Sequence, residues 1–499
     1  MNRLICRLGF LLLAIAVLAS GLPAVAADAP SKPAAATPAA RPAVSVAVDA
    51  RVELICIVFR LAGHPEYNRG RVKSYVDDVE RQFGPFRNHA VVALAQKLRR
   101  TRGVSFDACM SMAVHLTDAE RIEERVPFDP RPDGLDARWP LAEARTFVNE
   151  LRKFAAESRF AEFFAAHRSL YETAEKRMQG LLDQEGHLEW FPEYFGERPG
   201  ARFTVALALL NGPSNYGPHC RLPDGKEELY CILGAWETDA EGLPRFSKGV
   251  LETVVHEFCH SHTNAIVDRH EAELKPAGEK LYARVAAAME RQAYGQWKTM
   301  MYESLVRACT IRYVRRYQGT LAGWWKTREE RGRQFAWVGE LADLLAEYET
   351  GRDRYRTLDA FAPRIVKFFN EYAEKAAREP VPAAPRAVSV SPADGATDVD
   401  PGLKEIRVVF DRPMQDQSWS LVGGPPDLPE VTGRPKYDAA RTTWTVPIRL
   451  QPGTAYRFML NSDRFRAFRS ADGVPLEPVT VRFKTAPRRS DSRLDAKQR

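Results

Sequence analysis

The stretch Leu251-Glu-Thr-Val-Val-His-Glu-Phe-Cys-His260 decides how the rest of this chain is interpreted. It has no Gly or Pro and its polar residues recur at helical spacing, which predicts a helix. His256 and His260 are four positions apart, so both imidazoles project from one face and can reach the same ion. Glu257 lies about 100° around the helix from His256, where its carboxylate can reach a metal-bound water. This H-E-x-x-H pattern is typical of zinc hydrolases, with the glutamate as general base.

The residues around this motif are uncharged, which suits a buried helix; they are Thr253, Val254, Val255, Phe258 and Cys259. Ionisable side chains in such a helix are costly to bury unless they bind something. The alternative interpretation is a pair of solvated or core histidines beside a surface glutamate. The uncharged neighbours favour the metal site over that alternative.

A catalytic zinc site uses three protein ligands and one open position, and this helix supplies only two of them. The downstream candidates for the third ligand are Asp268, His270, Glu271, Glu273 and Glu303. The first four fall in a short polar stretch that we place just beyond the end of the helix. Glu303 lies on a helix predicted over 297–317, on a face shared with less polar side chains, and a buried carboxylate needs a partner. We therefore predict Glu303 as the third zinc ligand, with an ion pair to Arg307 as the alternative.

The first 27 residues have the pattern of a secretory signal peptide. Arg3 and Arg7 precede an apolar run over 8–18, and Ala24-Val-Ala26 offers a small-residue cleavage site. Retention of this segment as a membrane anchor is the alternative. Residues 28–45 are rich in Ala and Pro and predict an extended, disordered linker. Because no later run approaches about 18 apolar residues, we expect no membrane span after signal cleavage.

The net charge bears on the class of binding partner, and the cysteine content bears on disulfide formation. The formal net charge is +7, of which the signal contributes +2 and residues 488–499 contribute +3. The remainder, about +2, argues against nucleic acid as a partner. One of the 7 cysteines, Cys6, lies in the predicted signal peptide. Because we expect the rest of the protein to be exported to an oxidising compartment, its other cysteines could form disulfides. Cys220 and Cys231 flank a Pro-Asp-Gly turn at 223–225, and we predict a disulfide between them.

From 46 to 377 the sequence predicts one mixed domain that is mainly helical. Residues 52–58 are compatible with a buried strand or with the start of a helix. Amphipathic helices are predicted over 71–82, 88–99, 140–157 and 159–184. Two apolar runs, 203–210 and 230–236, predict buried strands joined through the turn at 223–225, in a small antiparallel sheet. Strands followed directly by the histidine helix fit an α+β, zincin-like metallopeptidase domain.

A Pro-rich linker over 378–387 ends this domain. After it, period-two alternation of apolar residues predicts short strands, at 406–410, 444–448, 456–460 and 479–483. Roughly a hundred residues of such strands, 388–486, predict an Ig-like β-sandwich. Residues 487–499 are predicted to be a disordered, charged tail.

Four segments of this C-terminal region stand out, namely Ser391-Pro-Ala-Asp-Gly-Ala-Thr-Asp-Val399, Val409-Phe-Asp-Arg-Pro-Met414, Leu450-Gln-Pro-Gly-Thr-Ala-Tyr456 and Val481-Arg-Phe-Lys-Thr485. On these segments the region resembles the bacterial Ig-like domain first described in surface-layer proteins. The resemblance implies a spacer or adhesion module without chemistry of its own.

A second resemblance rests on Leu61-Ala-Gly-His-Pro-Glu-Tyr-Asn68, His256-Glu-Phe-Cys-His-Ser261 and Tyr302-Glu-Ser-Leu-Val-Arg-Ala308. With these segments, residues 46–375 resemble an uncharacterised family of exported bacterial proteins that carries H-E-x-x-H. The resemblance implies a gluzincin-like metallopeptidase with His256 and His260 as ligands and Glu257 as base. It also places Glu303 at the third ligand position. The chain departs from some gluzincins at Arg307, where they have an acid.

Other polar residues receive structural interpretations. His262 is about 240° around the helix from His256, so it cannot join the metal cluster while the helix continues. We expect it to lie behind the metal ligands or in a cleft, with a solvated surface position as the alternative. Segment 61–68 is predicted to be a structural turn, with a direct role for His64 or Glu66 as the alternative. A solvated helix face is predicted for four basic residues, Arg307, Arg312, Arg315 and Arg316. The sequence contains neither a Gly-rich phosphate loop nor a Gly-x-Ser-x-Gly elbow, so nucleotide and serine-hydrolase chemistry lack support.

Taken with its resemblances, the sequence predicts an exported, periplasmic or secreted zinc metallopeptidase acting on peptide or protein substrates. The edge of the predicted strand pair could hold an extended substrate by backbone pairing. Two other functions stay open. One is a non-enzymatic cell-envelope binding protein with a structural or inactive zinc site, and the other is a zinc amidase acting on the cell wall.

Overall fold

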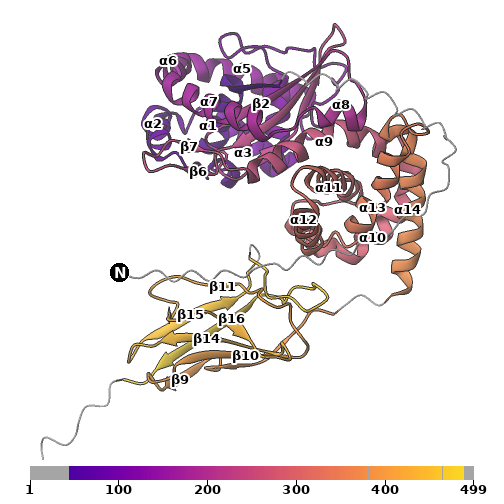
Figure 1. Cartoon of the computed structure of the whole chain (residues 1–499). Coiled ribbons are helices and arrows are strands. Elements are labelled where there is room, and N and C mark those ends of the chain that lie inside the picture. The colour runs from indigo at the N-terminus through magenta and orange to yellow at the C-terminus, as the bar shows by residue number, and fades with distance from the viewer. Residues whose placement is uncertain (1–43, 380–382, 463–464, 488–499) are drawn as a thin grey trace, which may run out of the picture. The chain divides into compact units, whose positions relative to one another are not determined.

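The computed structural model describes residues 44–379, 383–462 and 465–487 (Figure 1). The predicted signal peptide, all but the last two residues of the predicted linker 28–45 and the tail beyond residue 487 lie outside the described residues. Strand β1 (Val44–Val48) begins inside that predicted linker. It is a strand rather than linker because it pairs in parallel with β2 (Ala201–Ala208), with Val44 opposite Phe203.

A mixed sheet forms the centre of the first domain. Its order is β1-β2-β5-β3, with β5 (Glu227–Gly234) parallel to β2. The short strands β3 (Asn215–Tyr216) and β4 (His219–Arg221) pair antiparallel with the other edge of β5. Every residue of β5 is buried, as expected for a parallel strand covered on both faces.

The predicted antiparallel pairing of the two apolar strands is wrong. Strands β2 and β5 begin and end two or three residues before the predicted bounds, 203–210 and 230–236, and they run in parallel. The turn at Asp224 and Gly225 joins β4 to β5 instead, because residues 209–226 reverse the chain and contain two short strands of their own. Continuous apolar runs show that a strand is buried, but they carry no information on the direction of its neighbour.

The predicted Cys220–Cys231 disulfide is also wrong. Both cysteines are buried, and all cysteines among the described residues are free thiols. Cys220 on β4 is in register with Glu228 on β5, three residues before Cys231. Three residues span about 10 Å of strand, and an odd spacing points the two side chains to opposite faces of the sheet. A disulfide needs Cα atoms within roughly 7 Å, so this register excludes the bridge.

Helices surround the sheet in the first half of the domain. Residues 52–58 belong to helix α1 (Ala50–Leu61), which settles the choice between strand and helix, and Asp49 caps its first turn. The predicted helix over 159–184 is divided at His167 into two helices, α6 and α7. The other elements of this half are η1 (Pro65–Tyr67), α2 (Lys73–Phe83), η2 (Gly84–Phe86), α3 (Ala90–Arg102), α4 (Asp107–Val114), α5 (Leu141–Glu157), α6 (Phe160–Ala166), α7 (Arg168–Glu185) and α8 (Trp190–Phe195).

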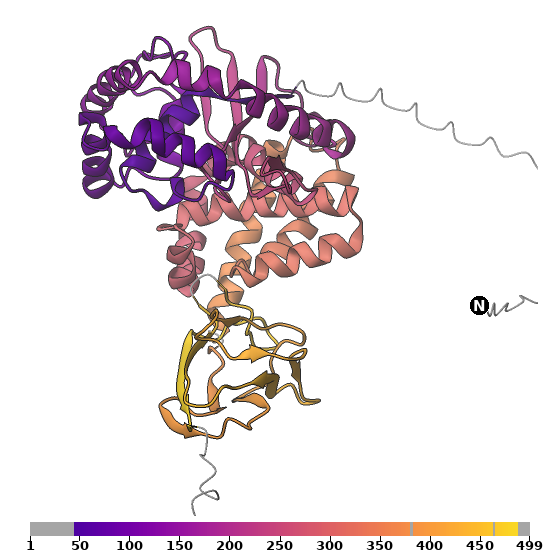
Figure 2. The ribbon, with the colours of Figure 1, turned by 90° about the vertical axis from the view of Figure 1, so that its left-hand side faces the viewer.

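The second half of the domain is helical apart from one short hairpin. Helix α9 (Gly249–Arg269) packs against β5 on one side and against α11 (Trp297–Tyr317) on the other. In Figures 1 and 2 the sheet-bearing part, indigo to magenta, and the later helices, pink to orange, form two adjoining groups. The remaining elements are β6 (Glu237–Thr238), β7 (Pro244–Arg245), α10 (Glu271–Arg291), α12 (Thr320–Gly332), α13 (Val338–Thr350) and α14 (Leu358–Arg378). Helix α9 therefore joins the sheet to the helices that follow it.

Glu53 is an ionisable group inside the apolar core of this domain. Its Oε2 accepts a hydrogen bond from the Tyr75 hydroxyl at 2.6 Å, and its Oε1 accepts one from the Leu209 backbone N–H at 2.7 Å. Burial disfavours the charged carboxylate and raises the pKa of Glu53 from 4.5 to about 7.

The raised pKa of Glu53 predicts a pH-dependent stability. Between pH 4.5 and about 7 the folded domain binds a proton that the unfolded chain releases. This contribution is therefore complete below the unfolded pKa and is lost as pH rises through the folded one. Between pH 5 and 8 the free energy of unfolding should fall by roughly 2–3 kcal/mol more in the parent than in Glu53→Gln. Urea unfolding of the full chain at several pH values measures this difference in the free energy of unfolding. The same pH dependence in the parent and in Glu53→Gln would contradict the prediction.

The C-terminal region is a β-sandwich, as its alternating apolar residues predicted. One sheet has the order β12-β14-β10-β8, with β13 also paired to β14, and the other has the order β11-β15-β16-β9. The strands are β8 (Ala387–Ser391), β9 (Ala396–Val399), β10 (Glu405–Phe410), β11 (Leu421–Val422), β12 (Glu430–Val431), β13 (Lys436–Tyr437), β14 (Thr443–Arg449), β15 (Ala455–Leu460) and β16 (Val479–Thr485). Inward residues of both sheets, such as Val408, Trp444, Phe458 and Val481, form one apolar core.

Candidate metal centre

Helix α9 presents two histidines on one face. The ring centroids of His256 and His260 lie 5.0 Å apart, and their planes are nearly perpendicular at 81°. The side chains are 18% and 17% exposed, so each ring is mostly buried but can still be reached from outside. This is the placement that a spacing of four residues produces on a helix.

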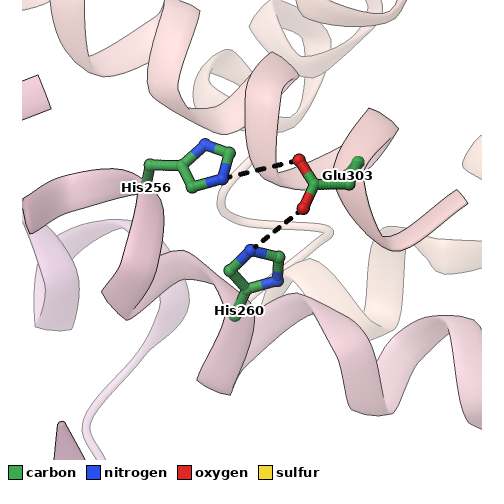
Figure 3. A group of neighbouring side chains, drawn as sticks. All are labelled: His256, His260 and Glu303. Carbon is green, nitrogen blue, oxygen red and sulfur yellow. Dashed lines mark ion pairs between the residues drawn. The ribbon is translucent and has the colours of Figure 1, made fainter. Parts of the chain in front are cut away.

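Glu303 meets both histidines from helix α11. Its Oε2 lies 3.5 Å from Nε2 of His256, and its Oε1 lies 3.5 Å from Nε2 of His260 (Figure 3). Within the described ranges, these residues form the one group of three whose potential ligand atoms all lie within 4.8 Å of one another, and we call it the metal-ligand group. Two atoms that each bind one tetrahedral ion at about 2.1 Å lie roughly 3.4 Å apart. The spacing therefore suits a single ion bound by all three side chains.

The other candidates for a third ligand have different partners. The stretch that holds them is not a loop, because α9 continues to Arg269 and α10 begins at Glu271. Asp268 and Glu271 both form ion pairs with Lys298, at 2.7 and 2.6 Å. His270 lies against Glu273, its neighbour one turn later. Helix α9 is longer than predicted because its last two turns remain packed through buried Ile266 and Val267.

Glu257 lies directly below the segment that follows β3. A Cβ atom added to Gly217 would lie 2.6 Å from the Glu257 carbonyl oxygen and 3.2 Å from its Oε2. Glycine is thus required at this position by the close approach of the chain to Glu257. Glu257 is 9% exposed, and burial raises its pKa from 4.5 to about 7. The carboxyl therefore lies under the edge of the sheet, one residue after His256.

Burial and charge set the protonation of the three grouped side chains. Burial lowers the pKa of His256 to about 3, which leaves its ring neutral. Burial acts on His260 in the same direction, but the contact with Glu303 outweighs it and raises the pKa of His260. Burial alone would raise the pKa of Glu303, yet Arg307 and the two histidines hold it well below its usual range. Glu303 is therefore an ionised carboxylate inside the protein.

Arg307 is buried, so the predicted solvated face is wrong for this residue, whereas Arg316 on the same helix is exposed. The side chain of Arg307 is 3% exposed, and it donates from Nη2 to Oε2 of Glu303 at 2.7 Å. The ion pair between Glu303 and Arg307, which was the alternative to a metal ligand, is thus present, and it is buried. The three other arginines pair with carboxylates of neighbouring elements, namely Arg312 with Glu349, Arg315 with Asp343 and Arg316 with Glu193. Tertiary partners of this kind cannot be inferred from the spacing of charges along one helix.

His262 lies away from the metal-ligand group, on a face of α9 that contacts aromatic rings. It stacks on Phe195 with centroids 4.4 Å apart, and also lies near Phe191 and Phe203. Burial lowers the pKa of His262 to about 3, so the ring is neutral. It lines a cavity of about 600 Å³ together with Phe191 and Phe203. This agrees with the predicted position in a cleft outside the metal cluster.

The polar side chains of segment 61–68 for which a direct role was the alternative are buried and make structural contacts. His64 and Glu66 are each 1% exposed. Oε1 of Glu66 accepts hydrogen bonds from Arg99 at 2.7 Å and from the Phe106 backbone N–H at 3.3 Å. The segment therefore ties α1 to the loop before α4 and does not contribute to the metal-ligand group.

Known proteins with similarity to this chain identify a family for it but state no activity. No curated protein matches the chain. Two solved structures of the surface-layer protein SbsC are similar to parts of it, at 17% and 12% identity over 47% and 80% of this chain, with TM-scores of 0.14 and 0.15. The chain spans 33% and 46% of those two proteins, less than half of either. In the part of the chain that the structure describes, no helix is both long and apolar enough to cross a membrane.

Two family models match the sequence. The model described as a bacterial Ig-like domain matches residues 381–485, the β-sandwich region. The other is described as a domain of unknown function, so its description states no activity. It matches residues 44–368, well over half of the chain, and includes His256, Glu257, His260 and Glu303. The chain therefore belongs to the family of this domain of unknown function, DUF4932.

Proposed function

We propose that this protein is an exported zinc metallopeptidase of the gluzincin type. The observation that carries the proposal is the convergence of His256, His260 and Glu303 from two helices, with Glu257 next to them under the sheet edge. Two imidazoles and one carboxylate form a ligand set known from zinc peptidases, and three protein ligands leave one position open. The buried but reachable rings suit a site that must admit both an ion and a substrate.

In this proposal each side chain has a separate task. Zinc, when bound, would polarise the substrate carbonyl and lower the pKa of a bound water from about 16 toward about 7. Glu257 would accept a proton from the attacking water and pass it to the leaving amine. Glu303 and the two histidines would serve only as ligands.

The sheet edge beside Glu257 supports a peptide as substrate. Strand β3 is the outermost strand on this side, and the chain continues from Tyr216 directly over Glu257 at Gly217. An extended peptide can add to such an edge through backbone hydrogen bonds, which would align its carbonyl groups along the site. A mixed sheet with an antiparallel edge strand above the histidine helix is also why we propose a zincin-like domain.

Export is part of the proposal and rests on two features of the sequence. The first 27 residues have the charged, apolar and small-residue regions of a signal peptide. The C-terminal residues 381–485 match a bacterial Ig-like domain, which we propose as a spacer in the periplasm or outside the cell.

One observation favours a non-enzymatic alternative. Glu303 already has a buried cationic partner in Arg307, so its burial does not by itself require a metal ion. A cell-envelope protein with an inactive or purely structural site would keep this ion pair and need no open ligand position.

Metal content and hydrolysis of the purified full chain test the proposal together. We expect about one zinc per chain, with hydrolysis of casein that a chelator abolishes and added zinc restores. Zinc binding without hydrolysis would favour the structural alternative. Release of peptides from peptidoglycan alone would identify an amidase, and a chain that binds no metal would overturn the proposal.

A further inference from the structure

Arg307 lies at the centre of a buried polar network behind Glu303. Its Nη2 donates to Oε2 of Glu303 at 2.7 Å and to the Tyr294 hydroxyl at 3.0 Å. Its Nη1 forms an ion pair with Glu330 on α12, and Glu330 is 1% exposed. The guanidinium carbon lies 4.6 Å from the centre of the Phe335 ring. Partners on three sides therefore hold the guanidinium group in one orientation.

The network continues through α12 back to the histidine helix. Nζ of Lys326 lies 3.1 Å from Oε1 of Glu330 and 3.2 Å from Oε2 of Glu252. Glu252 is on α9, one turn before His256, so the same helix carries one end of the network and the two histidines. Helix α12 is thereby connected by charged pairs to both helices that form the metal-ligand group.

This arrangement fixes the orientation of the Glu303 carboxylate. Oε2 is the oxygen that Arg307 binds at hydrogen-bond distance. Oε2 also lies 3.5 Å from Nε2 of His256, and Oε1 lies 3.5 Å from Nε2 of His260. A planar guanidinium group can bind Glu303 and Glu330 at once because its N–H groups point in fixed directions, which a single ammonium group cannot reproduce.

We propose that Arg307, held by Glu330, is a positioning residue that fixes the carboxylate of Glu303 in the orientation in which it faces both histidines. The proposal rests on the proposed function, since it assigns Glu303 as a metal ligand. Arg307 takes the place of the acidic residue that some gluzincins have at this position, but it orients the carboxylate ligand rather than a histidine.

Cobalt binding to Arg307→Lys tests this positioning role. Lysine keeps the positive charge, so the repulsion between residue 307 and a bound cation stays, and only the fork-shaped geometry is lost. We expect the affinity for Co²⁺ to fall about 10–100-fold, the usual effect of removing an outer partner of a ligand. The visible absorption of bound Co²⁺, which reports its coordination, should also change. Arg312→Lys is the matched control, because Arg312 is on the same helix but pairs with Glu349, and it should leave both properties unchanged.

Two further comparisons keep the outcomes separate. Glu330→Gln should also lower the affinity for Co²⁺, because it removes the carboxylate that holds Arg307. If Arg307→Lys does not fold, Glu330→Gln tests the positioning role in its place. Parental affinity and spectrum in a folded Arg307→Lys, or in Glu330→Gln, would overturn the positioning role while leaving the metallopeptidase proposal intact. Failure of the parent chain to bind Co²⁺ or zinc at all would instead overturn the proposed function itself.

Discussion

Glu257→Gln is expected to keep its bound metal and to lose hydrolysis by about two to four orders of magnitude, the usual contribution of a general base. Glutamine has nearly the same size and can occupy the space below Gly217, so the fold should be retained. Its amide cannot accept the proton of the attacking water. The loss should therefore fall on kcat rather than on KM.

Metal content and steady-state kinetics on casein measure this effect in the same preparations. Glu273→Gln is a suitable control, because Glu273 is an exposed carboxylate on α10 that is not in the metal-ligand group. Hydrolysis by Glu257→Gln at the parental rate would show that the general-base assignment is wrong. Loss of metal from the variant would show that Glu257 has a role in binding the ion.

Glu303→Ala is expected to bind far less zinc than the parent, because it removes one of the three proposed ligands. The change also leaves Arg307 with one carboxylate fewer in a buried position, which can destabilise the domain by about 3–5 kcal/mol. Glu303→Gln is therefore needed beside it, since glutamine keeps the volume and one acceptor oxygen for Arg307. Both variants should lose zinc while thermal unfolding shows that Glu303→Gln is still folded.

Glu271→Ala is the control for this experiment. Glu271 is another candidate for the third ligand, from the polar stretch after the histidine helix, and it pairs with Lys298 on the protein surface. We expect Glu271→Ala to keep the parental zinc content. Full zinc occupancy in Glu303→Ala together with loss in Glu271→Ala would mean that the third ligand has been assigned to the wrong residue.

Local periodicity was sufficient for the parts of the site that lie within single helices. His256 and His260 share a face because their spacing of four residues matches the turn of a helix, whatever surrounds it. Helix α11 has the bounds 297–317 that the sequence predicts, and the apolar residues on the face of Glu303 correctly indicated that its carboxylate is buried. The alternating residues of the C-terminal region predicted the sandwich for the same reason, since each strand has one buried face.

Pairings between distant parts of the chain were decided only by the tertiary structure. The direction of β2 relative to β5, the register that separates Cys220 from Cys231, and the position of Gly217 over Glu257 all depend on how residues 209–226 cross the sheet. Arg307 shows the same limit. Its spacing from Glu303 suggested an ion pair between them, but its burial and its contact with Glu330 required α12 to pack against α11. Period and spacing describe one element at a time, whereas burial of a charge depends on which other elements close around it.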